Sequence, residues 1–267
     1  MTESDSNNIM KINSYISIDL ETTGLNPKLD RIIEVGAVKV VDGQIVDTFE
    51  TLINPGRKLE ERIADLTCIT DGDLADKPYI EDVLPKLLQF MEMDGVSLDA
   101  SQITGAAGGV GALPMLGHSI LFDYSFLKKA AVDRKLKFEK WGVDTLKIAR
   151  KYLPELEHRS LGYLCNFYQI PHKPHRALND AEATHLLYQR LCQEFYKEEE
   201  SLFYGHLLQF QVKRDTPITI PQKEQLYRLM KQHNLTVDVE VERLTRSEAS
   251  RLTDQLLATC QKREIHL

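Results

Sequence analysis

The sequence predicts an α/β fold in which helices flank a mixed β-sheet, followed by a small helical unit near the C-terminal end. A short apolar run at residues 15–20 has the pattern of a strand buried on both faces. Two runs rich in β-branched residues follow at residues 31–42 and 44–53, and the Asp42-Gly43 pair between them is a strong hairpin-turn signal. A strand meander that is followed by strand–helix alternation is typical of a mixed sheet.

Helical periodicity dominates the chain after this meander. In the first such segment Ile80, Val83, Leu84 and Leu87 fall on one stripe, as an amphipathic helix requires. The predicted helices cover residues 79–93, 122–134, 144–152, 160–168 and 176–195, and a short strand is predicted at residues 116–120.

The chain divides into a main domain and a smaller unit. We expect the main domain at residues 1–198, an irregular linker at residues 199–216 and a helical C-terminal unit at residues 217–267. Capping boxes at Thr219 and Thr245 start the two helices of this unit. Because about 50 residues with two amphipathic helices bury little surface alone, the unit is expected to pack against the main domain or a partner. Its residues indicate no chemistry of their own.

Composition indicates a cytoplasmic protein. No run of about 18 uncharged apolar residues is present, so no transmembrane segment is predicted. The first residues are polar and acidic, unlike a secretory signal peptide. Cys68, Cys165, Cys192 and Cys260 are scattered without the spacing of a zinc site, and we expect them to be reduced thiols.

The net charge of −7 disfavours a protein that holds nucleic acid by bulk electrostatics. It does not exclude a nuclease, because a carboxylate site is acidic until divalent cations fill it. A glycine-rich segment at residues 105–112 offers a phosphate-binding loop as one interpretation. Neither G-K-[ST] nor G-x-G-x-x-G accompanies it, so the sequence favours a surface insertion.

Asp19 and Glu21 lie at the end of the first predicted strand. Residues i and i+2 of a strand point to the same face, so the two carboxylates stand side by side. Ionised carboxylates at the end of an apolar strand are costly unless they are paired or bind metal. The alternative is that Asp19-Leu20-Glu21 simply ends an exposed strand.

Three further residues complete the candidate site. Asp123 lies at the start of a predicted helix, where a carboxylate is also a favourable N-cap. His175 precedes the long helix at residues 176–195, and Asp180 lies a little more than one turn inside it. A surface histidine and an Asp180–Arg176 ion pair are the alternatives for these two positions.

The order of these pieces, Asp-x-Glu, then Asp, then His-x4-Asp, resembles the DEDDh family of 3′→5′ exonucleases, which includes the proofreading epsilon subunit of bacterial DNA polymerase III and RNase T. The resemblance covers about residues 13–194. The segment at residues 66–70 is similar to the family's usual Leu-Thr-Gly-Ile-Thr, with Cys68 in place of glycine. The second motif also departs from the family's common Gly-His-Asn, since Ser119 replaces the asparagine.

The resemblance implies an RNase H-like fold with a mixed five-stranded sheet, and two divalent cations, Mg²⁺ or Mn²⁺. Asp19, Glu21, Asp123 and Asp180 correspond to the metal-binding carboxylates and His175 to the general base. Oxygen ligands suit these hard cations. Two such metals about 4 Å apart clamp the attacking and leaving oxygens of a phosphodiester displacement.

The resemblance also implies contacts with the terminal nucleotide. Leu25 corresponds to a wedge against the terminal bases, and the backbone of Thr22 to a donor to the 3′-hydroxyl. Ser119 and Phe126 correspond to further substrate contacts. The most basic stretch near the site contains Lys128, Lys129, Arg134, Lys135 and Lys137, for which a solvated helix face is the alternative to a strand contact.

The expected activity is metal-dependent 3′→5′ hydrolysis of single-stranded or frayed DNA, releasing nucleoside 5′-monophosphates in editing or repair. The expected partners are a single-stranded 3′ end and a DNA polymerase or repair complex. A 3′→5′ exoribonuclease is the alternative, because no residue indicates whether the site requires or rejects the 2′-hydroxyl of RNA. A scaffold that has lost catalysis is disfavoured because all five site residues are present. The sequence leaves open whether the protein acts alone or with a polymerase, and its oligomeric state.

Overall fold

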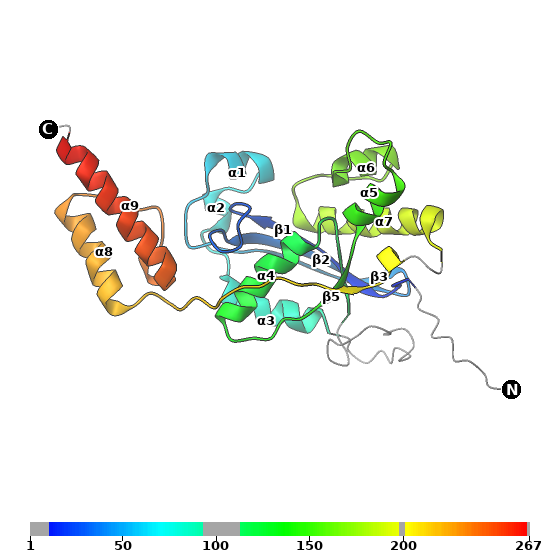
Figure 1. Cartoon of the computed structure of the whole chain (residues 1–267), viewed down its shortest axis with the longest axis horizontal. Coiled ribbons are helices and arrows are strands. Elements are labelled where there is room, and N and C mark those ends of the chain that lie inside the picture. The colour runs from blue at the N-terminus through cyan, green and yellow to red at the C-terminus, as the bar shows by residue number, and fades with distance from the viewer. Residues whose placement is uncertain (1–10, 93–112, 198–200, 266–267) are drawn as a thin grey trace.

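The computed structural model describes residues 11–92, 113–197 and 201–265, without the side chains after residue 260 (Figure 1). The glycine-rich segment at residues 105–112 therefore lies outside the described residues. The strands are β1 (Tyr15–Thr22), β2 (Ile32–Val41), β3 (Gln44–Leu52), β4 (Met115–Gly117), β5 (Trp141–Asp144) and β6 (His206–Leu207).

The strands form one mixed sheet in the order β3-β2-β1-β4-β5-β6. The pairs β3–β2 and β2–β1 are antiparallel, whereas β1–β4 and β4–β5 are parallel, so the predicted mixed sheet is confirmed. The described sheet has six strands and not the expected five. The additional strand is the two-residue β6, which comes from the expected linker and pairs antiparallel with β5 at the sheet edge. Two residues are too few to show the alternation of apolar and polar side chains from which a strand is predicted.

The hairpin between β2 and β3 is confirmed. Asp42 and Gly43 connect the strands with φ angles of 48° and 78°. Two consecutive residues with positive φ are the pattern of a type I′ turn, whose twist matches that of the flanking strands. An Asp-Gly pair provides this geometry at low cost, because aspartate tolerates the left-handed region and glycine adopts it freely.

The predicted helices are present with small shifts of their ends. They are α3 (Ile80–Phe90), α4 (Leu121–Asp133), α5 (Thr145–Tyr152), α6 (Leu161–Phe167) and α7 (Ala177–Phe195). Two short helices, α1 (Glu61–Thr67) and α2 (Asp71–Leu74), are present in addition to the predicted ones. Seven and four residues are too few to establish a helical period. Among the described helices, none is both long and apolar enough to span a membrane.

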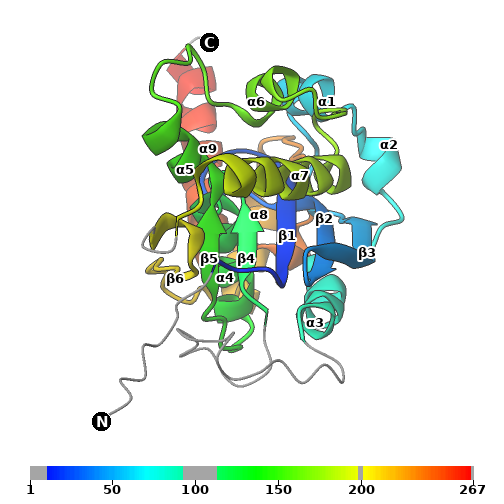
Figure 2. The ribbon, with the colours of Figure 1, turned by 90° about the vertical axis from the view of Figure 1, so that its right-hand side faces the viewer.

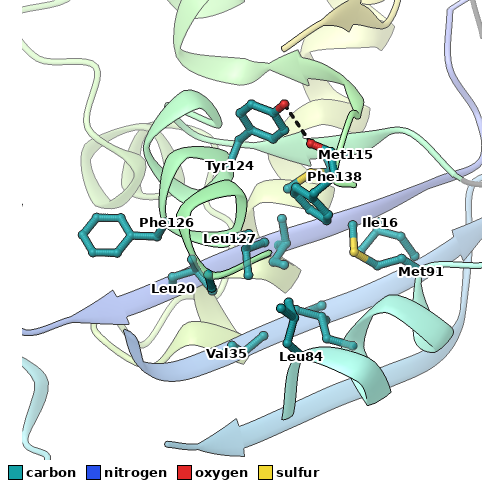
Figure 3. Packing of buried hydrophobic residues seen from close by; sticks show 14 of the residues in the cluster. Ile16, Leu20, Val35, Leu84, Met91, Met115, Tyr124, Phe126, Leu127 and Phe138 are labelled. Atoms are coloured by element: carbon teal, nitrogen blue, oxygen red, sulfur yellow. Dashed lines mark hydrogen bonds between the residues drawn. The ribbon is translucent and has the colours of Figure 1, made fainter. Parts of the chain in front are cut away.

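Helices cover the two faces of the sheet (Figures 1 and 2). On one face α3 and α4 pack on the even-numbered side chains of β1, and Figure 3 shows Ile16 and Leu20 in this cluster together with Tyr124, whose hydroxyl donates to the Phe138 carbonyl at 3.1 Å. On the other face α7 lies across β1 and β2. The Ser17 hydroxyl on that face donates to the Ala181 carbonyl of α7 at 2.7 Å. The odd-numbered side chains of β1 therefore face α7.

The C-terminal unit contains α8 (Ile220–Gln232), the 3₁₀ turn η3 (Val241–Arg243) and α9 (Arg246–Ile265), and it lies at one end of the main domain (Figure 1). Both predicted capping boxes are present, at Thr219 with Gln222 and at Thr245 with Glu248. The unit has a small core of its own. Ion pairs and an isolated β-bridge from Arg57 to Val239 connect it to the main domain.

Gly36 allows α7 to approach the sheet very closely. It lies in β2 directly opposite Asp19 of β1. A Cβ atom at this position would lie 2.0 Å from the Leu178 nitrogen and 2.1 Å from the Ala177 carbonyl carbon. Both atoms are backbone of the first turn of α7, so no side-chain rotation would relieve the clash.

We predict that Gly36→Ala lowers the free energy of unfolding by about 3 kcal/mol, because the methyl group forces α7 away from the sheet. Urea unfolding measures this loss. The matched control is Gly72→Ala in α2, where a Cβ would meet only the Thr70 hydroxyl oxygen at 3.6 Å. Equal stability of the two variants would contradict the importance of the close contact.

Candidate active site

Three carboxylates meet between β1 and the first turns of α7. One carboxylate oxygen from each of Asp19, Glu21 and Asp180 lies within 4.8 Å of the others. Asp19 and Glu21 reach this point from one face of β1, as the i, i+2 spacing predicts. Asp180 reaches it from α7 because Gly36 permits the close approach of that helix. Asp19 and Glu21, which are neighbours in sequence, thus form one cluster with Asp180, about 160 positions later.

Glu34 holds the N-terminus of α7 on the sheet. It is fully buried in β2, and its Oε2 accepts from the Ala177 backbone N–H at 3.0 Å. Its Oε1 accepts from Nε and Nη2 of Arg176 at 3.0 and 2.9 Å. A carboxylate here accepts a hydrogen bond from an amide that the helix leaves unpaired. The positive end of the helix dipole also stabilises its negative charge. No local pattern in the sequence indicates this role of Glu34.

The alternative interpretation of Asp180 is wrong. The Arg176 guanidinium pairs with Glu34 and Glu50 and not with Asp180. Arg176 contacts Asp180 through its backbone alone, since its N–H donates to Oδ2 at 3.2 Å. Asp180 therefore stays in the carboxylate cluster without a neutralising guanidinium.

Asp123 joins the site from the opposite side of β1. It is the third residue of α4, 3% exposed, and its Oδ1 accepts from the Leu20 backbone N–H at 3.1 Å. The N-cap of α4 is Ile120, so the interpretation of Asp123 as an N-cap is wrong. Asp123 instead connects α4 to the strand between Asp19 and Glu21.

Burial and mutual repulsion make the ionised carboxylates costly. The pKa of Asp19 is raised well above its usual range, first by burial and then by the charges of Asp123 and Asp180. Burial also raises the pKa of Asp123. The pKa of Glu21 rises to about 7 through burial and the charges of Asp180 and Glu34, which Arg176 partly offsets. Such a set of hard oxygen donors fits divalent cations, which would remove the repulsion.

Two histidines precede α7 and differ in their surroundings. His175 is exposed, has a left-handed φ of 67°, and its ring has no hydrogen-bond partner among the described residues. His172 instead hydrogen-bonds Asp180, with Nε2 and Oδ1 2.6 Å apart and the His172 side chain 7% exposed. The His175 backbone adjoins the Arg176 N–H that donates to Asp180, while the His175 side chain is exposed. His172 had no signal in the sequence beyond a loop position near the helix.

The loop after β1 carries two of the predicted substrate residues. Leu25 is 84% exposed, which suits a wedge against bases. Thr22 is buried, and its hydroxyl donates to the Gly24 carbonyl at 2.6 Å, which keeps the chain close to the carboxylates.

The other two predicted substrate residues lie around α4. Ser119 has a φ of 76°, and its N–H donates to Oδ1 of Asp144 at 3.0 Å. Asparagine, which the family commonly has here, adopts a left-handed conformation more readily than serine. Phe126 is 3% exposed and packs against Phe122 in the core cluster, with 5.0 Å between ring centroids (Figure 3).

The basic stretch of α4 is largely neutralised within the protein. Lys128 pairs with Glu139, Lys129 with Asp133, and Arg134 with Glu81. Lys135 and Lys137 are exposed to solvent. These contacts argue against a continuous basic groove, and the burial of Lys128 shows that this part of the stretch is not a solvated helix face either.

Comparison with known proteins agrees with this arrangement. The model of the exonuclease family, RNase_T, matches residues 16–104 and 113–188, which include all five candidate site residues. The chain belongs to the exonuclease family. Within that family its features are those of the DEDDh type, whose members normally use divalent metal ions. The match omits residues 105–112, so the glycine-rich segment is an insertion relative to the family model.

Individual relatives extend this result. The chain is 32% identical to the PolC-type DNA polymerase III of Caldanaerobacter subterraneus subsp. tengcongensis over 94% of its own length but spans only 18% of that polymerase. It resembles the structure of exonuclease X in complex with 5′ overhanging duplex DNA, with a TM-score of 0.50, 25% identity, and coverage of 69% of this chain and 95% of that one. The DEDDh nuclease domain of 3′hExo bound to rAMP shares the fold, with a TM-score of 0.56, 19% identity, and coverage of 75% and 98%.

We predict that Asp19→Asn stabilises the metal-free protein while abolishing metal-dependent hydrolysis. A raised pKa means that the ionised carboxylate is disfavoured in the folded chain, so above the pKa of the unfolded chain Asp19 lowers the stability of the fold, whereas a neutral amide does not. The Tm in EDTA should rise by roughly 2–4 °C for each kcal/mol of repulsion removed. Thermal melts of the exposed control Asp65→Asn should match wild type. A lower Tm for Asp19→Asn in EDTA would contradict the repulsion.

Proposed function

We propose that the chain is a metal-dependent 3′→5′ exonuclease that acts on single-stranded or frayed DNA and releases nucleoside 5′-monophosphates. The observation that carries the proposal is the convergence of Asp19, Glu21 and Asp180 at one point beside buried Asp123, in a chain of the exonuclease family. PolC-type relatives are DNA polymerases, and exonuclease X was determined with DNA, which supports DNA as the substrate.

In this proposal the four carboxylates hold two divalent cations, Mg²⁺ or Mn²⁺. When bound, these cations lower the pKa of water and stabilise the charge of a phosphodiester displacement. The chain's own groups position the strand. Exposed Leu25 contacts the terminal base, and the buried Thr22 backbone lies beside the terminal hydroxyl. Ser119 lies at the neighbouring surface, whereas Phe126 is buried and supports it from the core.

His175 is the proposed acceptor of the proton of the attacking water. Histidine is the side chain that most often acts as a general base in enzymes. His175 is exposed and directly precedes Arg176, whose backbone N–H donates to Asp180, so it borders the carboxylate cluster at the start of α7. His172 then serves as a positioning residue that orients Asp180.

The relatives also suggest the protein's setting. The region similar to this chain lies within a much longer polymerase in the PolC-type relatives. We infer that this chain acts in DNA editing or repair and associates with a DNA polymerase or repair complex.

The proposal is tested with one oligonucleotide labelled at either end. With Mg²⁺ or Mn²⁺, a 3′ label should appear at once as a mononucleotide, while a 5′ label should give a ladder of shortened strands. EDTA should stop both reactions. A matched RNA oligonucleotide run in parallel distinguishes the substrates, and faster RNA degradation would overturn the choice of DNA in favour of an exoribonuclease.

We predict that His175→Ala lowers kcat by about 10²–10⁴-fold, the usual contribution of a general base, with little change in KM. His172→Ala is the matched comparison from the same loop. It should lower kcat less, because Asp180 retains the Arg176 N–H as a hydrogen-bond donor. Steady-state kinetics on the labelled oligonucleotide measure both. A larger loss for His172→Ala would transfer the base role to that residue.

A further inference from the structure

The loop that carries Leu25 is closed at its base by backbone contacts. We call residues 23–31 the β1–β2 loop. The Thr23 N–H donates to the Arg31 carbonyl at 2.8 Å, and the Arg31 N–H donates to the Thr23 hydroxyl at 3.0 Å. Within the loop, the N–H groups of Leu29 and Asp30 donate to the Asn26 carbonyl. The loop is thus a defined turn whose orientation depends on what holds Arg31.

A residue of the C-terminal unit holds that base. Glu248, in the first turn of α9, accepts from Nη2 of Arg31 at 2.5 Å and from Nη2 of Arg57 at 2.7 Å. Nη1 of Arg57 donates to the Leu29 carbonyl of the loop at 3.0 Å. The Thr245 N–H donates at 2.8 Å to Oε2, the oxygen that also accepts from Arg31 at 2.5 Å, which completes the capping box. One carboxylate therefore joins α9, the loop base and the segment after β3.

The charges at this junction require Glu248. Its side chain is only 9% exposed, and Arg31 and Arg57 are 28% and 21% exposed. Burial and the charge of Arg31 lower the pKa of Arg57, so the two guanidiniums repel one another. Burial alone would raise the pKa of Glu248, but the charge of Arg31, the Thr245 N–H and the charge of Arg57 lower it to about 2. Glu248 is thus ionised and offsets both cations.

Apolar packing at this junction does not take the place of the contacts between Glu248 and the two arginines. A cavity of about 340 Å³ lies at the junction of the loop base, α4 and the C-terminal unit, and its lining includes Asp30, Arg31, Phe126 and Thr245. Figure 1 shows α8 and α9 at the end of the sheet toward which β1 runs. Where the loop base borders this cavity, ion pairs and hydrogen bonds hold it in place.

We propose that Glu248 is a positioning residue for substrate binding, and that the C-terminal unit supports the β1–β2 loop through it. By fixing Arg31 and Arg57, Glu248 sets the orientation of the loop and so of Leu25 against the terminal nucleotide. The inference rests on the proposed exonuclease function for what the loop grips. It assigns a role to a unit whose own residues indicate no chemistry.

A second set of contacts provides the control. The Tyr79 hydroxyl donates to the Glu240 carboxylate at 3.0 Å, and Arg243 stacks on the Tyr79 ring at 3.0 Å and pairs with Glu81 at 2.5 Å. These contacts attach the C-terminal unit to the start of α3 without reaching the β1–β2 loop. Glu240→Gln and Glu248→Gln therefore each remove one carboxylate that attaches the C-terminal unit to the main domain. Glu240→Gln, however, leaves the contacts at the base of the β1–β2 loop intact.

The experiment compares Glu248→Gln, Glu240→Gln and wild type by hydrogen exchange and by kinetics in the full chain. In Glu248→Gln we expect faster exchange of the amides in residues 23–31 and a KM for the DNA oligonucleotide raised about fivefold or more, with kcat little changed. A looser loop weakens the grip on the strand without moving the carboxylates. Glu240→Gln should match wild type in both measurements.

Each other outcome has a defined meaning. Wild-type exchange in Glu248→Gln, or equal effects of the two variants, would overturn the proposal, since the unit would then act only by docking as a whole. If Glu248→Gln does not fold, Arg57→Gln replaces it, because it removes the contact to Leu29 and must also speed exchange of the loop. If wild type degrades no oligonucleotide, the exonuclease function fails, whereas the exchange data still report on the support of the loop.

Discussion

The site depends on how closely the start of α7 approaches β2. Gly36 has no side chain, so the backbone at Ala177 and Leu178 lies where a methyl group would otherwise stand. Glu34, two residues earlier on the same face, accepts the first amide of the helix and holds it there. This distance carries Asp180 to Asp19, which lies opposite Gly36 in the sheet. A missing Cβ and a buried carboxylate thus fix the geometry of the cluster.

The carboxylate cluster lowers the stability of the folded chain. Burial and mutual repulsion raise the pKa values of Asp19, Glu21 and Asp123, so the ionised carboxylates are held together against their own charges. The force that holds them comes from the other face of β1, where the even-numbered side chains lie in the apolar core with α3 and α4 (Figure 3). Alternation along one strand therefore separates the stabilising face from the functional face.

The remaining charges are mostly used inside the protein. Lysines and arginines of α4 pair with neighbouring acids, and Arg31 and Arg57 pair with Glu248 from more than 190 residues away in sequence. This distribution agrees with the net charge of −7 and with a strand gripped at its end. The ion pairs also make the C-terminal unit part of the structure around the β1–β2 loop, although its own core is separate.

The sequence by itself determined the hairpin and the main helices, because Asp42-Gly43 and the 3.6-residue periods are local patterns. It indicated the chemistry of the site through the order of its motifs, which resembles that of the DEDDh family. Strands β5 and β6 and helices α1 and α2 are too short to carry such a period. Only the tertiary structure decided that His172 contacts Asp180 while His175 points to solvent, and that Arg176 serves Glu34. It also decided that Glu248 meets Arg31. These contacts join segments distant in sequence or depend on backbone angles in a loop, and no local propensity specifies either.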